Sequence, residues 1–179
     1  MYGILPAFVK LWLVFTSVVC SIDALFLMLR PLSLKHRLFA KFFSLWVIYA
    51  DVDLHYGTSN DLMTHMLERL MWVEISLNFV ALLMDLFCSR HTLLTTFTTT
   101  VMVLWKTIVF FAFYVDVPEG NPSPFPENVE LLRVVLIFWM PNLIWVAAPL
   151  YVIVVLWKMM LPKEDEAPPK YCLSVQHPA

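Results

Sequence analysis

Long apolar stretches alternate with polar segments along this chain. Stretches with little or no charge cover residues 5–29, 70–87, 93–115 and 134–157. A helix of about 20 apolar residues spans the hydrocarbon core of a bilayer. The pattern therefore predicts an all-α integral membrane protein with a bundle of four transmembrane helices, the second of which can begin near Met63.

A further apolar segment, residues 38–56, is rich in aromatic side chains and reaches a charge at Asp51. About a dozen apolar residues precede that charge, which favours an interfacial or re-entrant helix over a fifth span. The bundle is expected over residues 5–160. A polar tail, expected to be disordered, follows over residues 161–179.

The connections carry signals of their own. Ser59 or Asn60, in the turn before the second apolar stretch, is the expected N-cap of the next helix. The acidic, proline-rich loop 116–127 is expected to be an extended connection exposed to water.

Composition supports a membrane protein and excludes several function classes. Of the 179 residues, 60% are hydrophobic and 15% charged, against about 45–50% and about 25% in soluble domains. A net charge of -2 implies no bulk attraction to nucleic acid. The three cysteines show no metal-ligand spacing, and the three glycines form no phosphate-binding loop. We therefore expect no metal and no other cofactor.

Four polar side chains interrupt the apolar stretches: Asp23, Glu74, Lys106 and Asn142. A charged side chain in the bilayer core costs about 2.5–3.5 kcal/mol on insertion scales, so such groups usually face a protein interior or a cavity. Asp23 is either a carboxylate near the membrane interface or an acid facing a cavity. Glu74 is either a general acid or the partner of Lys106 in an ion pair, and Lys106 could instead extend to the interface.

Asn142 and Trp145 are three residues apart and therefore share one face of a helix. An amide and an indole on one face can orient a polar group and stack on a flat or cationic ligand. Alternatively, Asn142 binds backbone groups left unpaired by Pro141 and Pro149.

Several of these residues lie in segments that resemble one family. Residues 45–56 follow the pattern LW-x-x-YA-x-x-D-x-x-Y, which resembles a segment of the emopamil-binding proteins, the sterol isomerases with an EXPERA domain. Glu74 is similar to the glutamate in the family's next membrane helix. Asn142-x-x-Trp145 followed by Pro149 is similar to the motif of its last helix, and Asp23 lies where the isomerases carry an acid. The resemblance covers residues 19–160.

The resemblance implies a multi-pass helical bundle in the endoplasmic reticulum membrane with a lipophilic cavity. It also implies a mechanism in which an acid protonates a ring double bond, amide and aromatic groups stabilise the cation, and a base removes a different proton. The catalytic candidates are Asp23 and Glu74, and the substrate-binding candidates are Asn142, Trp145, Tyr49, Asp53 and Lys106.

Three functional hypotheses follow. The first is a cofactor-independent isomerase or cyclase acting on a sterol- or terpenoid-like lipid. The second is a non-catalytic lipid-binding or trafficking protein that resembles the sigma-2 receptor; it is suggested by the four spans, by Val19 where the isomerases carry a histidine, and by Lys106. The third is a structural membrane subunit with a Lys106–Glu74 pair. Expected partners are a lipophilic polycyclic small molecule and membrane lipid, with a second copy of the chain as a further candidate, and no nucleic acid.

Overall fold

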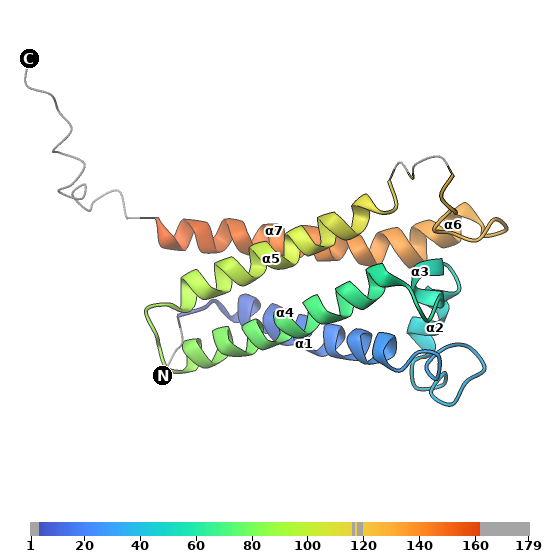
Figure 1. Cartoon of the computed structure of the whole chain (residues 1–179). Helices are drawn as coiled ribbons and strands as arrows, with labels where there is room; N and C mark the ends of the chain where they lie inside the picture. The colour runs from blue at the N-terminus through green and yellow to red at the C-terminus, as the bar shows by residue number, and fades with distance from the viewer. Residues whose placement is uncertain (1–3, 116, 118–119, 162–179) are drawn as a thin grey trace, which may run out of the picture.

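The computed structural model describes residues 4–115, 117 and 120–161, which form helices and turns without a strand. The long helices run up and down and pack in the order α1, α4, α5, α7 (Figure 1). Their bounds are Ala7–Met28 for α1, Leu62–Leu86 for α4, Thr92–Ala112 for α5 and Met140–Met160 for α7. Helix α7 continues α6 (Leu131–Val134) and the π-helix η1 (Val135–Trp139).

Three helical segments are long and apolar enough to cross a membrane: Ala7–Met28, Thr92–Ala112 and Leu131–Met160. They match three of the apolar stretches in the sequence to within a few residues and indicate a membrane protein. Helix α4 is 25 residues long but carries charged side chains and is not among these three. Its charges are those of Glu68, Arg69, Glu74 and Asp85.

Helix α4 directs polar side chains toward the other helices. From Thr64 onward its buried residues recur every three or four positions, and the full set is Met63, Thr64, Leu67, Met71, Glu74, Asn78, Ala81 and Asp85. Asn78 donates to the Thr16 hydroxyl at 3.1 Å. Asp85 accepts a hydrogen bond from the backbone N–H of Leu5 at 2.7 Å and pairs with Lys10 at 3.3 Å. Helix α1 and the residues just before it therefore contact two of the buried polar side chains of α4.

The segment between α1 and α4 covers one end of the bundle (Figure 1). It contains two short helices, α2 (Ser44–Ala50) and α3 (Leu54–Gly57), neither long enough to cross a bilayer. Arg30 fastens this segment: its guanidinium donates to the carbonyl of Thr58 at 2.5 Å and to the Thr64 hydroxyl at 2.9 Å. A single side chain thus joins the end of α1 to α3 and to the first turn of α4.

The N-cap of α4 is Asp61, so the expectation of Ser59 or Asn60 is wrong. Asp61 directly precedes the helix, and its carboxylate accepts the backbone N–H of Thr64 at 2.8 Å. The residue just before the helix is the one whose side chain reaches a free N–H of the first turn. The His55 ring lies 2.7 Å from the other Asp61 oxygen, which adds a tertiary reason for this choice.

The described part of the loop before α6 folds back onto the bundle and is not simply extended in water. The carbonyl of Pro124 accepts the backbone N–H of Leu54 at 2.9 Å. The Phe125 ring packs against Tyr114 and Phe138, with ring centroids 5.6 and 5.1 Å apart. The loop therefore covers the same end of the bundle as α2 and α3. The predicted tail lies, beyond Leu161, outside the described residues.

Candidate functional site

A cavity of about 450 Å³ lies among the long helices and beneath α2 and α3. This volume is within the usual range of small-molecule sites, about 300–1,000 Å³. Most of the wall is apolar. Its polar groups belong to Cys20, Asp23, Trp46, Tyr49, Tyr56, Lys106, Thr107, Asn142 and Trp145. A large apolar wall with a few polar groups suits a lipophilic ligand held in one orientation.

Asp23 is part of the cavity wall, and two aromatic side chains hold its carboxylate. The indole N–H of Trp46, on α2, donates to Oδ1 at 3.1 Å. The hydroxyl of Tyr56, on α3, donates to Oδ2 at 3.2 Å. Each carboxylate oxygen keeps further acceptor capacity for a ligand. Of the two interpretations of Asp23, the cavity-facing one agrees with this geometry.

Asn142 and Trp145 line the same cavity from one face of α7. The Asn142 amide nitrogen donates to the Tyr49 hydroxyl at 2.8 Å and to the carbonyl of Phe138 at 2.7 Å. Both interpretations of Asn142 therefore apply, since one side chain lines the cavity and also binds the backbone one turn away. The Trp145 ring packs on Phe15 of α1, with ring centroids 5.9 Å apart.

Glu74 lies behind the cavity wall. Its side chain is 4% exposed, and the Lys106 ammonium approaches Oε2 at 2.5 Å. The Cys20 thiol lies 3.6 Å from Oε1. Lys106 and Cys20 line the cavity, whereas Glu74 does not. The ion pair expected as one alternative is therefore present, and Lys106 turns into the bundle instead of extending to the interface.

Asp53 does not line the cavity but supports a residue that does. It is fully buried and caps α3, where Oδ1 accepts the backbone N–H groups of His55 at 2.9 Å and Tyr56 at 3.4 Å. Its Oδ2 accepts the Tyr114 hydroxyl at 2.7 Å. Asp53 thus fixes the helix that carries Tyr56, which in turn holds Asp23. A direct role of Asp53 in ligand binding does not follow from this position.

We predict a pH dependence of stability that originates at Asp53. Burial raises the pKa of this carboxyl to about 6, against the lowering effect of the Tyr114 hydrogen bond. A raised pKa means that the folded protein holds the proton more tightly than the unfolded chain. The contribution of Asp53 to stability is therefore complete below about pH 4 and is lost as the pH rises through about 6.

Asp53→Asn tests this assignment because asparagine is an equally good N-cap and does not titrate. Thermal unfolding in detergent micelles should show that the unmodified chain loses roughly 3 kcal/mol relative to the variant across this pH window. Parallel pH profiles for the two proteins would show that Asp53 does not titrate in this range.

Two of the residues that hold the site were not expected from the sequence. Trp46 and Tyr56 belong to the aromatic segment 45–56, but the sequence pattern did not predict that either would hydrogen-bond to Asp23. Cys20 is three residues before Asp23 and hence on the same helix face, which is the one local signal that it would reach the site.

Comparison of the chain with protein-family models, with curated proteins and with solved structures finds no match. The functional assignment therefore depends on the cavity and on the chemistry of its polar groups.

Proposed function

We propose that this chain is a membrane isomerase or cyclase that acts on a sterol- or terpenoid-like lipid through a carbocation. The observation that carries the proposal is a carboxylate, Asp23, in the wall of an apolar cavity that also presents Asn142 and Trp145. The resemblance to the emopamil-binding proteins, on the residues given above, points to the same chemistry.

Asp23 is the proton-transfer group in this proposal. In its acid form it gives a proton to one carbon of a ring double bond, which leaves a carbocation in the cavity. The resulting carboxylate, held by Trp46 and Tyr56, then takes a proton from a different carbon. One proton is added and one removed, so the product is an isomer of the substrate. A ring closure between the two steps gives a cyclase.

Trp145 and Asn142 stabilise the cation. The face of an indole attracts positive charge by about 0.5–2 kcal/mol, more when water is excluded. The amide nitrogen of Asn142 donates hydrogen bonds to Tyr49 and Phe138. Its side-chain carbonyl oxygen has no hydrogen-bond partner among the described residues. A fixed carbonyl dipole in an apolar cavity stabilises a positive charge without reorganising.

Glu74 acts on the site through Lys106. A lone ammonium in the wall would repel a carbocation, whereas the 2.5 Å pair with Glu74 makes this part of the wall nearly neutral. We therefore assign proton transfer to Asp23 and give Glu74 the role of a positioning residue. This differs from the expectation that both carboxyl groups move protons.

We further propose that α4 is a fourth span and that the bundle lies in the endoplasmic reticulum membrane, as the resemblance implies. Three polar residues along α4, Glu74, Asn78 and Asp85, are buried, while outward residues such as Val73, Phe79 and Leu86 are apolar and exposed. Charged residues that face the protein interior, with apolar residues outside, are the usual arrangement of a helix in lipid.

A second candidate function is non-catalytic lipid binding or trafficking. Two observations favour it: Val19 lines the cavity where the isomerases carry a histidine, and Lys106 neutralises Glu74. Such a protein would use the same cavity and release its ligand unchanged.

Solvent deuterium separates the two functions. Microsomes that contain the chain are supplied with candidate polycyclic lipids in deuterated water, with vector-only microsomes as the control. The isomerase proposal expects a product that carries solvent deuterium at a ring carbon, because the acidic proton of Asp23 exchanges with water. A product without solvent deuterium contradicts the proton-transfer mechanism. Lipids that bind but return unchanged favour the second function.

A further inference from the structure

The Lys106 ammonium has more N–H donors than it has hydrogen-bond partners among the described residues. Its side chain is 12% exposed and lines the cavity. An ammonium carries three N–H donors, and among the described residues its one hydrogen-bond partner is Glu74. A buried donor without a partner costs about 1–3 kcal/mol, and more when it is charged. Two N–H groups therefore remain for an acceptor inside the cavity.

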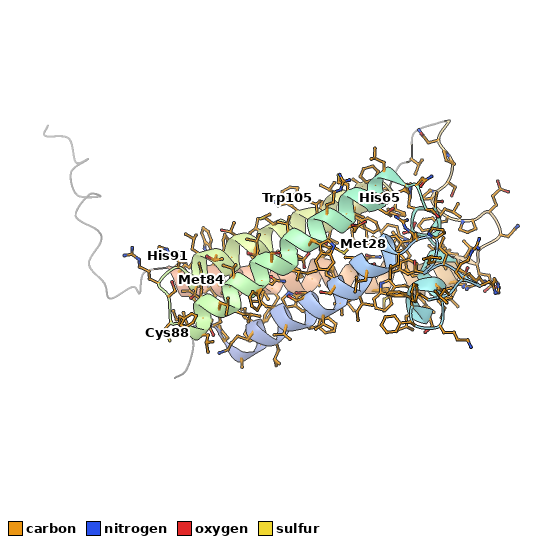
Figure 2. The ribbon with its side chains drawn as sticks, turned by 60° about the horizontal axis from the view of Figure 1, so that its bottom comes forward. Met28, His65, Met84, Cys88, His91 and Trp105 are labelled. Atoms are coloured by element: carbon orange, nitrogen blue, oxygen red, sulfur yellow. The ribbon has the colours of Figure 1, made fainter. Side chains whose placement is uncertain are left out.

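The position of this ammonium is fixed. The Glu74 carboxylate contacts Lys106 through one oxygen and Cys20 through the other, at 2.5 and 3.6 Å. Both oxygens are thus engaged, which restrains the carboxylate and the ammonium that it holds. The preceding residue, Trp105, points away from the bundle and is 60% exposed (Figure 2). Lys106 lies three residues after the buried Val103 and four before the buried Phe110, so the register of α5 turns it inward.

We propose that Lys106 recognises the carbonyl oxygen of a neutral polycyclic ketone. A carbonyl oxygen has two lone pairs and no hydrogen, so it can accept one of the remaining N–H groups without bringing a donor of its own. A hydroxyl would also bring a donor, for which the ammonium offers no acceptor, so an alcohol would need a second partner such as the Asp23 carboxylate. This inference rests on the proposed function, because it names the class of lipid that occupies the same cavity.

The charges around the cavity favour a neutral ligand. Lys106 and Asp23, two groups of opposite charge type, both line the cavity. An ammonium on the ligand would bring further donors to the remaining N–H groups of Lys106, which offer no acceptor, and a carboxylate would meet the carboxyl group of Asp23. A ketone avoids both conflicts and still gives Lys106 an acceptor. A water molecule could also accept these N–H groups, but the entering ketone replaces it with an equivalent acceptor.

Three matched probes test the inference: a steroid ketone, the hydrocarbon that lacks its oxygen, and the amine with an ammonium at the same carbon. Binding to the full chain in lipid nanodiscs is followed by tryptophan fluorescence, because Trp46 and Trp145 line the cavity. We expect the ketone to bind at least about 10-fold more tightly than either other probe, as for a hydrogen bond to a charged donor.

The test variant is the double substitution Glu74→Gln with Lys106→Met. It removes both charges together, so that neither charge is left buried alone. In this variant the ketone should bind no better than the hydrocarbon. Lys106→Arg, which keeps the charge and the donors, should retain part of the preference. If the double variant does not fold, the ranking of the three probes on the unmodified chain still tests whether the cavity prefers the ketone.

The outcomes separate this inference from the proposed function. Equal binding of ketone and hydrocarbon, or a preference that persists in the double variant, overturns the role of Lys106 while the cavity keeps its lipid ligand. If the amine binds most tightly, the role of Lys106 is also overturned, and the Asp23 carboxylate is the charge that selects the ligand. Failure of all three probes to bind contradicts both proposals, because the cavity would then hold no polycyclic lipid.

Discussion

Lys106→Met is expected to destabilise the protein by about 3–5 kcal/mol, because it leaves the Glu74 carboxylate buried without its counter-ion. Glu74 is 4% exposed, and its one remaining hydrogen-bond partner among the described residues is the weakly donating thiol of Cys20. Glu74→Gln should also destabilise, since it leaves the ammonium unpaired. The double variant, Glu74→Gln with Lys106→Met, should recover most of the loss because neither charge remains.

Thermal unfolding of the four proteins in the same detergent measures this coupling as a double-mutant cycle. Lys35→Met is the matched control: Lys35 also forms an ion pair, with Asp51 at 2.8 Å, but its side chain is 56% exposed. An exposed pair contributes about 0–1 kcal/mol, so this control should unfold close to the unmodified chain. Additive effects of the two buried substitutions would show that the Glu74–Lys106 pair does not support the fold.

The pattern of apolar residues predicted most of the fold. Three of the predicted apolar stretches correspond to the helices Ala7–Met28, Thr92–Ala112 and Leu131–Met160. They were predictable because a helix must have a long apolar run to cross a bilayer. The predicted N-cap of α4 was wrong, since several consecutive polar residues can each act as an N-cap. Two side-chain contacts accompany the observed start: His55 to Asp61, six residues apart, and Arg30 to Thr64, which are distant in the sequence.

The candidate site could be predicted only where its residues share one element. The spacing of Asn142 and Trp145 on a single helix was enough to place both on one face, and both line the cavity. The sequence pattern could not predict that Glu74 lies behind the cavity wall. Periodicity identifies the inward face of α4, but it does not show which side chains of other helices cover that face. Trp46 and Tyr56 reach Asp23 across the turn after α1, a contact that no local spacing encodes.

The second large effect is expected for turnover. Asp23→Asn should lower the rate of lipid conversion by about 10²–10⁴-fold, the usual contribution of a general acid–base group. The change removes the transferable proton but keeps the shape of the side chain. The amide oxygen still accepts the Trp46 N–H, and the Tyr56 hydroxyl can accept from the amide nitrogen in place of donating. Stability and lipid affinity should therefore change little.

Asp51→Asn is the matched control for this substitution, because it removes a carboxylate that pairs with Lys35 and does not line the cavity. Conversion is measured by product formation in nanodiscs, and affinity by tryptophan fluorescence on the same preparations. A loss of conversion with affinity retained assigns proton transfer to Asp23, since a structural defect would reduce both. Conversion at the unmodified rate would exclude Asp23 as the acid. A parallel loss of affinity, with thermal unfolding unchanged, would mean that this carboxylate holds the ligand, as the lipid-binding alternative requires.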